Sequence, residues 1–573
     1  LCATINFLMF RLLFLLIPNL VFSQSSLIDY SHPYHSTYTD KGIVVSQNYL
    51  SSDIGVEILN KGGNAIDAAI AVGFSLTATL PRAGNIGGGG FMQIYIENDK
   101  TLLTIDFRSM APKLATREFY QEAKNKDDDV TRKGYKAIAV PGTVAGLFKA
   151  HELYGSIPMA DLIQPTIDLL EKGVPITQDL YLAINKGKYI QNDPESNKIY
   201  KKNLALGGKL QINDLVKTLK IIQVSGRDGF YKGEIAELIH NQMIANDGLI
   251  RKEDLSAYKV NLYSPIKTSY RGKQVFAMGA PSGGGVVVLT ALNVLECFQL
   301  SHLTPNSART YHLIAEAMKF AHHNRSKYVG DPSFSDIPYD MLLSKKLACE
   351  KAKKINLKQA STPKQTARTG NQINDSFKES KDTTHYSIVD KEGNAVSVTY
   401  TLGYSFGSGV TIPGTGILTN NQMNNFAHSY GISDSYFRSS SPANKLEPLK
   451  RPMSTMTPVM VFDNKGSLEL ITGSPGGSQI PGVVLQVLIN NIEFGLDIGA
   501  ASMVPRIHQD SQSLNLEYEK FISEDTLRIL ESFGHKLEVS DTMGSTQSIE
   551  IIDGVRYGYA DLRRPSAKVS VQQ

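Results

Sequence analysis

Cysteine and net charge are both scarce in this sequence, and each scarcity excludes a class of protein. The 573 residues include three cysteines, Cys2, Cys297 and Cys349, too few for a disulfide framework and at no spacing typical of a zinc site. The formal net charge of +4 is spread along the chain, so we expect no surface for nucleic acid. Cys297 and Cys349 fall in helix-like sequence, where buried free thiols are favoured over one disulfide between them.

A long unbroken apolar run, as needed to cross a bilayer, is also missing. The nearest candidate, residues 7–22, is interrupted by Arg11 and Pro18 and is followed by Ser23, which suits a small-residue cleavage site. We therefore interpret residues 1–23 as a signal peptide, the alternative being an uncleaved N-terminal anchor. The interpretation predicts a secreted or periplasmic protein with no stable membrane span.

Several common catalytic motifs are absent as well. The sequence has no Gly-x-Ser-x-Gly elbow, no His-Glu-x-x-His pair and no phosphate-binding loop. The run Gly87–Gly90 follows a helical pattern and precedes a strand, the reverse of a dinucleotide-binding turn, so close backbone packing is favoured. His322 and His323 would point about 100° apart on a helix, which favours structural or surface histidines over a metal site. No metal or cofactor is expected.

The patterns that are present predict an α+β fold without internal repeats. Residues 42–80 indicate a strand and two helices, with Ser51 and Ser52 as candidate caps of the first helix and Asn64 as the cap of the second. Residues 141–350 are mainly helical in pattern. Period-two alternation predicts hairpins over residues 385–402 and 457–473, and a helix beginning at Gly476 and Gly477 follows the second hairpin.

Residues 356–382 form a polar stretch with almost no apolar side chains, which predicts an exposed linker. The pattern changes abruptly to a strand at Thr383. If the Asp382–Thr383 bond were cut, the new α-amine of Thr383 would be a base for its own hydroxyl, the N-terminal-threonine form of a nucleophile–base pair. Many strands begin with threonine, so these residues alone leave an ordinary strand as the alternative.

The segment TTHYSIVDKEGNAVSVTYTL resembles the start of the small subunit of γ-glutamyltranspeptidases, N-terminal-nucleophile hydrolases made as one self-cutting precursor. Other segments resemble that family in the same order along the chain: LNKGGNAIDAAIAVGFSL, NIGGGGFM, IDFRSMAP, AVPGTVAGL, HLIAEAMKFAHHNRSKYVGDP, GILTNNQMNNF, KRPMSTMTP and TGSPGGSQI. The resemblance implies a four-layer αββα sandwich without a cofactor. It also implies two interlaced subunits, a large one over residues 24–382 and a small one over residues 383–573.

The resemblance implies roles for individual residues. Thr383 corresponds to the nucleophile and Thr401 to the threonine that activates it. Gly476 and Gly477 correspond to the oxyanion-binding pair, which agrees with their place at a predicted helix start, because first-turn N–H groups are free donors. The implied substrate-binding residues are Arg108 for the α-carboxylate, Ser454 and Thr455 beside it, Gln422 for the α-amino group, and Tyr436 in a lid between Phe426 and Lys450. Plain structural roles are the alternative for Arg108, the hydroxyl pair and the glycine pair.

Two positions depart from the family pattern. Asn425 stands where an aspartate usually pairs with the substrate ammonium, and Gly403 replaces an asparagine near the same pocket. A neutral amide cannot neutralise a partly buried cation, a loss on the order of 1–3 kcal/mol. We therefore hypothesise that γ-glutamyl recognition is weakened and that acyl groups with a carboxylate but no amine, such as glutaryl, are tolerated.

The resemblance thus implies a γ-glutamyltransferase or glutathione hydrolase that passes the acyl group from a threonyl acyl-enzyme to water, amino acids or peptides. Its expected partners are glutathione-like donors, acceptor amines and the two subunits of one precursor. One alternative is an acylase for non-amino dicarboxylic groups such as glutaryl. An alternative from another class is an unprocessed relative that binds peptides without turnover.

Overall fold

The computed structural model describes residues 32–202, 204–361, 382–427, 441–511 and 513–573. The predicted signal peptide and most of the predicted linker lie outside these residues. All elements named below belong to the unit Ser36–Gln573.

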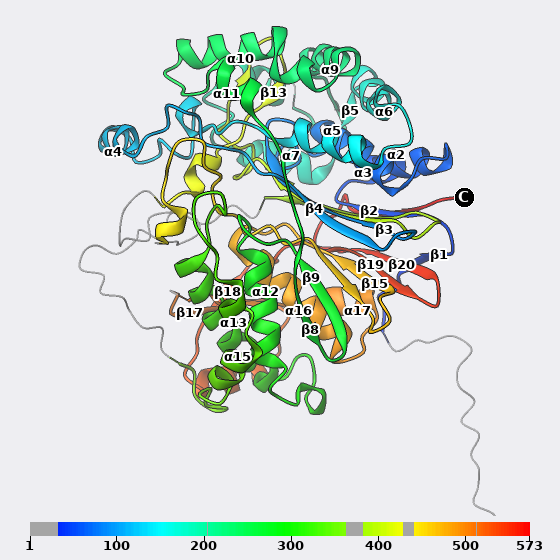
Figure 1. Ribbon diagram of the computed structural model, residues 1–573, viewed down its shortest axis with the longest axis vertical. Coiled ribbons are helices and arrows are strands. Elements are labelled where there is room, and N and C mark those ends of the chain that lie inside the picture. The colour runs from blue at the N-terminus through cyan, green and yellow to red at the C-terminus, as the bar shows by residue number, and fades with distance from the viewer. Residues whose placement is uncertain (1–31, 203, 362–381, 428–440, 512) are drawn as a thin grey trace, which may run out of the picture. The chain divides into compact units, whose positions relative to one another are not determined.

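Two antiparallel sheets, each of seven strands in the described part of the chain, lie face to face at the centre of this unit (Figure 1). Sheet 1 has the order β21 (Lys568–Val571), β2 (Ile43–Ser46), β10 (Thr384–Val389), β11 (Ala395–Thr401), β3 (Gly89–Ile96), β4 (Thr101–Phe107) and β7 (Asn261–Tyr263). Sheet 2 has the order β1 (Thr37–Thr39), β20 (Val555–Ala560), β19 (Gln547–Ile552), β15 (Leu468–Thr472), β14 (Val459–Phe462), β9 (Lys273–Ala277) and β8 (Ile266–Tyr270).

Both faces of sheet 1 are buried, because successive strand residues point to opposite faces. In β2, Ile43 and Val45 pack into the core between the sheets, whereas Val44 packs into the core beneath the helices. The core between the sheets also contains Tyr95 of β3 and Phe462 of β14, whose rings meet edge to face with centroids 4.9 Å apart.

Helices cover the outer face of each sheet and complete the four layers (Figure 1). The helices on sheet 1 include α2 (Tyr49–Asn60), α3 (Ala65–Thr79) and α5 (Thr143–Tyr154), and those on sheet 2 include α12 (Gly284–Leu295), α16 (Ile480–Ile492) and α17 (Ile498–Met503). Every residue of α3 is buried, as its apolar composition predicts. The predicted αββα architecture is therefore confirmed.

The remaining elements extend the two helical layers and the connections between them. They are α4 (Arg117–Lys126), α6 (Met159–Lys172), α7 (Gln178–Lys186), α8 (Pro194–Ser196), α9 (Asn213–Tyr231), α10 (Gly233–Ala245), α11 (Lys252–Ala257), α13 (Ala308–Tyr328), α14 (Tyr339–Leu342), α15 (Lys345–Ala352), α18 (Glu524–Ser532), β5 (Val174–Pro175), β6 (Lys209–Leu210), β12 (Thr411–Ile412), β13 (Ile417–Leu418), β16 (Ile507–His508), β17 (Asn515–Glu519) and β18 (Lys536–Ser540). No helix within the described residues has both the length and the apolar composition to cross a membrane.

Most local predictions are confirmed, with two corrections. The predicted hairpins are β10–β11 and β14–β15, and Asn64 caps α3 through a capping box with Asp67. The cap of α2 is Asn48, however, since the hydroxyls of Ser51 and Ser52 are buried within the helix on other partners. The helical interpretation of residues 141–350 also missed β7 and the hairpin β8–β9.

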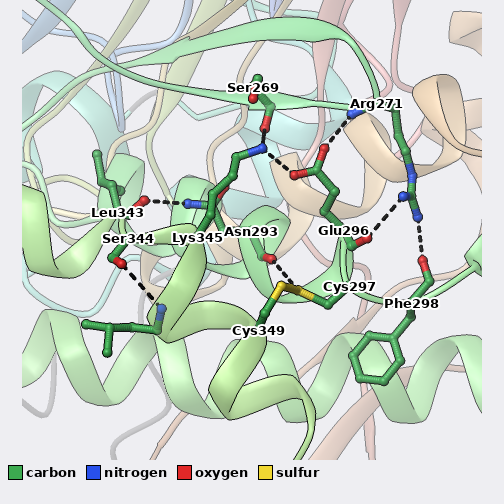
Figure 2. Close-up of a disulfide and its surroundings, with 11 residues drawn as sticks. Ser269, Arg271, Asn293, Glu296, Cys297, Phe298, Leu343, Ser344, Lys345 and Cys349 are labelled. Atoms are coloured by element: carbon green, nitrogen blue, oxygen red, sulfur yellow. Dashed lines mark hydrogen bonds and ion pairs between the residues drawn. A yellow bond between two sulfur atoms is a disulfide. The ribbon is translucent and has the colours of Figure 1, made fainter.

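The expectation of free thiols at Cys297 and Cys349 is wrong, because the two form a disulfide (Figure 2). Cys297 follows the end of α12 and Cys349 lies in α15, and the packing of these helices brings the two Cα atoms to 5.7 Å. Near the bond, the ammonium of Lys345 donates to the carbonyl oxygen of Ser269 at 2.8 Å and also contacts Glu296.

Removing this disulfide is expected to destabilise the fold without separating the predicted subunits. The bond closes a loop of 52 residues, worth about 4 kcal/mol of chain entropy in the unfolded state. For a protein of this size, Cys349→Ser should lower the melting temperature by about 4 °C. Differential scanning calorimetry of wild type and variant measures the shift, and wild type under reducing conditions is the matched control. An unchanged melting temperature in both would contradict the expectation.

Candidate active site

Thr383 lies directly before β10, one of the interior strands of sheet 1, and only 6% of it is exposed. The register of β10 and β11 places Thr384 opposite Tyr400, so Thr383 comes opposite Thr401 at the end of the hairpin. The hydroxyl of Thr383 donates toward that of Thr401 across 3.5 Å. The hairpin thus determines which two hydroxyls meet.

The hydroxyl of Thr401 also reaches the peptide bond that precedes Thr383. It donates to the carbonyl oxygen of Asp382 at 3.1 Å and accepts from the backbone N–H of Gly403 at 2.9 Å. Thr401 therefore contacts both the Thr383 hydroxyl and the carbonyl oxygen of the peptide bond before it. Donation from Thr401 polarises that carbonyl, which favours nucleophilic attack on its carbon.

Gly88 and Gly403 explain how the backbone around Thr401 is accommodated. A Cβ on Gly88 would come within 2.3 Å of the carbonyl oxygen of Thr401, so the glycine run serves close packing, as predicted. Gly403 has a φ of 108°, and a Cβ there would lie 2.1 Å from Oδ1 of Asn421. The asparagine that the resemblance leads us to expect at position 403 therefore does not fit there without a rearrangement of Asn421.

Asp382 has a second partner that the sequence did not reveal. Its carboxylate forms an ion pair with Arg82, a largely buried residue in the connection between α3 and β3. The available signal was an arginine within the otherwise apolar and glycine-rich segment LPRAGNIGGGG.

Gly476 and Gly477 lie at the start of a 3₁₀ turn (Gly477–Gln479) that continues into α16. Both have positive φ, 136° and 58°, which favours glycine. Among the described residues, neither backbone N–H has an acceptor, as is usual at a helix start. Gly473, three residues earlier, packs against the ring of His385, which brings this turn close to the start of β10.

Arg108, which follows β4, is a buried cation without a carboxylate partner among the described residues, and it is 1% exposed. Its guanidinium donates to the carbonyl oxygen of Pro452 at 3.3 Å and to Oδ1 of Asn425 at 2.6 Å, whereas its Nη1 has no acceptor among these residues. The nearby carboxylate of Asp106 instead pairs with Arg451. Burial lowers the pKa of Arg108 to about 9, so it stays protonated at neutral pH. This arrangement suits an anionic ligand.

The short 3₁₀ turn Gln422–Asn425 lies beside Arg108. The amide nitrogen of Gln422 donates to the carbonyl oxygen of Thr401 at 2.7 Å, and its buried Oε1 has no donor among the described residues. The side-chain oxygen of Asn425 is engaged by Arg108. Oε1 of Gln422 is therefore a buried acceptor with no donor in the described part of the chain, and it lies beside Thr401.

Ser454 and Thr455 connect the Arg108 segment to the glycine turn. The hydroxyl of Ser454 accepts the N–H of Met456 at 3.1 Å, and that of Thr455 donates to the carbonyl oxygen of Gly477 at 2.7 Å. The structure thus brings every predicted site residue except Tyr436 into one buried, connected region, and Tyr436 lies outside the described residues. Among the described residues, no group of His, Cys, Asp and Glu is arranged to hold a metal ion.

Comparisons with known proteins agree with this architecture. The family model described as Gamma-glutamyltranspeptidase matches residues 51–571. The chain is 42% identical over 537 residues to the glutathione hydrolase proenzyme of Escherichia coli (strain K12), covering 92% of each chain. It is 34% identical to the acylase ACY 1 proenzyme of Pseudomonas sp. (strain SE83), covering 93% of this chain and 94% of that protein. The crystal structure of cephalosporin acylase from Bacillus halodurans superposes with a TM-score of 0.82 at 29% identity, covering 96% of this chain and 99% of that one.

Proposed function

This chain belongs to the γ-glutamyltranspeptidase family of enzymes, and from that premise we propose that it cuts itself at Asp382–Thr383 and then cleaves γ-glutamyl amides such as glutathione. The acyl group passes to water or to the amine of an amino acid or peptide. The observation that carries the proposal is the contact of Thr401 with both the Thr383 hydroxyl and the Asp382 carbonyl.

Self-cleavage begins when Oγ of Thr383 attacks the carbonyl carbon of Asp382 while Thr401 supports the carbonyl oxygen. The C–N bond breaks, the nitrogen of Thr383 takes the hydroxyl proton, and an ester replaces the amide. Water hydrolyses the ester, which leaves a carboxylate on Asp382 and a free amine and hydroxyl on Thr383. That amine then serves as the base for the hydroxyl in turnover.

In turnover, Oγ of Thr383 attacks the γ-carbonyl of the donor, and the N–H groups of Gly476 and Gly477 stabilise the oxyanion. Thr455 fixes the peptide of Gly477 through its carbonyl oxygen, which keeps the turn in place. The amine of the donor leaves with a proton, and water or an acceptor amine then attacks the acyl-enzyme. Arg108 holds the substrate carboxylate with Nη1, which has no acceptor within the described ranges.

Sheet 1 supports the proposal that the two pieces, residues 24–382 and 383–573, stay associated after cleavage. The hairpin β10–β11 from the small piece pairs with β2 on one side and with β3 on the other, both from the large piece. Separation of the pieces would break both sets of strand hydrogen bonds. The disulfide favours an oxidising compartment, which supports a secreted or periplasmic location for the mature enzyme.

A second candidate, hydrolysis of glutaryl amides, is favoured by the contact of Asn425 with Arg108. In that contact the side-chain oxygen of Asn425 already accepts from the Arg108 guanidinium, and the neutral amide has no negative charge to offer a substrate ammonium. An acyl group with a carboxylate and no amine can still bind Arg108. It does not require the negative charge that an aspartate at position 425 would supply. The acylase proenzyme among the relatives supports an acylase activity in general, without naming the acyl group.

Paired kinetics on γ-glutamyl- and glutaryl-p-nitroanilide test both candidates. Wild type should hydrolyse both, and Asn425→Asp should raise the ratio of γ-glutamyl to glutaryl kcat/KM by about tenfold or more, because it restores a charge to the ammonium pocket. The matched control is Asn424→Asp, which adds the same charge at a side chain held by Thr131 instead. A ratio unchanged by Asn425→Asp, or changed equally by both variants, would contradict the assignment. If wild type hydrolyses neither of the two anilides, the proposed function is overturned.

A further inference from the structure

Asp382 is held at two points, its backbone carbonyl and its side chain. Thr401 donates to the carbonyl oxygen at 3.1 Å, and Nη1 of Arg82 pairs with the carboxylate. The side chains of Arg82 and Asp382 are 9% and 18% exposed, so the ion pair is largely removed from water. Asp382, whose carbonyl belongs to the proposed scissile bond, is therefore held through its backbone by Thr401 and through its side chain by Arg82.

Arg82 is anchored to the segment that carries Thr401. Its carbonyl oxygen accepts the N–H of Phe406 at 2.9 Å, and the carbonyl oxygen of Ala83 accepts the N–H of Leu402 at 3.2 Å. Backbone hydrogen bonds thus join the Arg82 segment to the residues that follow Thr401. A movement of Asp382 away from Arg82 would also draw its carbonyl away from Thr401.

The guanidinium of Arg82 is buried, so its charge requires a carboxylate partner. Its Nε is buried without an acceptor among the described residues, and burial together with the nearby charge of Arg564 lowers its pKa to about 10. Asp179 acts on it only through space, since the carboxylate of Asp179 accepts from the hydroxyls of Thr177 and Ser566. Asp382 is the carboxylate in direct contact with Arg82 in the described part of the chain.

We propose that Arg82 is a positioning residue for self-cleavage, fixing and neutralising the carboxylate of Asp382 while Thr383 attacks the carbonyl of the same residue. This inference rests on the proposed cut at Asp382–Thr383. As Oγ of Thr383 forms its bond, negative charge develops on the carbonyl oxygen of Asp382. An unneutralised carboxylate on that residue would oppose this charge and raise the barrier. Arg82 removes that repulsion and keeps the carbonyl against Thr401.

The test is a cleavage time course of freshly translated precursor on denaturing gels, for Arg82→Gln, Asp382→Asn and the double variant. Arg82→Gln should slow cleavage about tenfold or more, because it leaves a carboxylate beside the developing oxyanion and loosens the carbonyl. Adding Asp382→Asn should restore most of the lost rate, because it removes the charge that Arg82 neutralised. A defect that came only from lost packing around the Arg82 side chain would not be repaired in this way, because an asparagine at position 382 does not replace those contacts.

Two further variants keep the test decisive. Arg82→Lys retains the positive charge and should cleave at a rate between those of wild type and Arg82→Gln, so it replaces Arg82→Gln if the latter does not fold. Arg271→Gln removes a different arginine–carboxylate pair, with Glu493, and should cleave like wild type.

The inference is overturned if Arg82→Gln and Arg82→Lys cleave at the wild-type rate, or if the double variant is as slow as Arg82→Gln. A wild-type precursor that does not cleave at all would instead overturn the proposed self-cleavage. The two failures are therefore distinguishable on the same gel.

Discussion

Thr383→Ala is expected to remain a single chain and to lose anilide hydrolysis by at least about 10³-fold, because one hydroxyl supplies the nucleophile for both reactions. Its contact with Thr401, which in turn bonds the Asp382 carbonyl, is the physical basis of the expectation. Denaturing gels report the cleavage, and kcat/KM on γ-glutamyl-p-nitroanilide reports the turnover.

Thr384→Ala is the matched control for this expectation. Thr384 is also buried and is the first residue of β10, but its hydroxyl has no hydrogen-bond partner among the described residues. We expect Thr384→Ala to cleave and turn over substrate, and Thr383→Ser to retain both reactions because it keeps the hydroxyl. Cleavage of Thr383→Ala at the wild-type rate would show that another residue performs the attack.

Arg108→Gln is expected to lower kcat/KM by about 10²–10³-fold for γ-glutamyl and glutaryl anilides alike. Both acyl groups present a carboxylate, and Arg108 is a buried cation whose Nη1 has no acceptor among the described residues. The loss should fall mainly on KM, since the guanidinium binds a group remote from the reacting carbonyl. Steady-state kinetics on the two anilides measure it.

An acyl group without a carboxylate provides the control for Arg108→Gln. Butyryl-p-nitroanilide should be hydrolysed equally by wild type and variant, because it offers nothing for the guanidinium to bind. Self-cleavage should also persist, since the carboxylate of Asp382 pairs with Arg82. Unchanged kinetics on both dicarboxylic anilides would contradict the role proposed for Arg108.

The central hairpin and its residues could be predicted from the sequence because the signals are local. Period-two alternation defined β10 and β11, and their register then brings Thr383 opposite Thr401. A helix start at Gly476 and Gly477 was also predicted from the local pattern, and the structure adds that both residues have positive φ. The roles of these residues stay predictions, although their proximity follows from the fold.

The features that sequence reasoning missed depend on contacts between distant segments. The disulfide forms because α12 and α15 pack together, and the two cysteines are 52 positions apart in the sequence, with no local pattern that pairs them. Arg82 contacts Asp382, which is 300 positions away in the sequence. This ion pair could not be predicted from local sequence patterns. Asn425 was flagged for its missing charge, yet its hydrogen bond from Arg108 required the tertiary structure.

The N-terminal residue of the smaller fragment is the most direct test of the central claim, that Thr383 becomes a chain terminus and acts as the nucleophile. Purified wild-type protein should yield two fragments on a denaturing gel, and Edman degradation of the smaller one should begin at Thr383 and continue with Thr-His-Tyr-Ser. A chain that stays intact after prolonged incubation, or a fragment that begins at any other residue, would contradict the account.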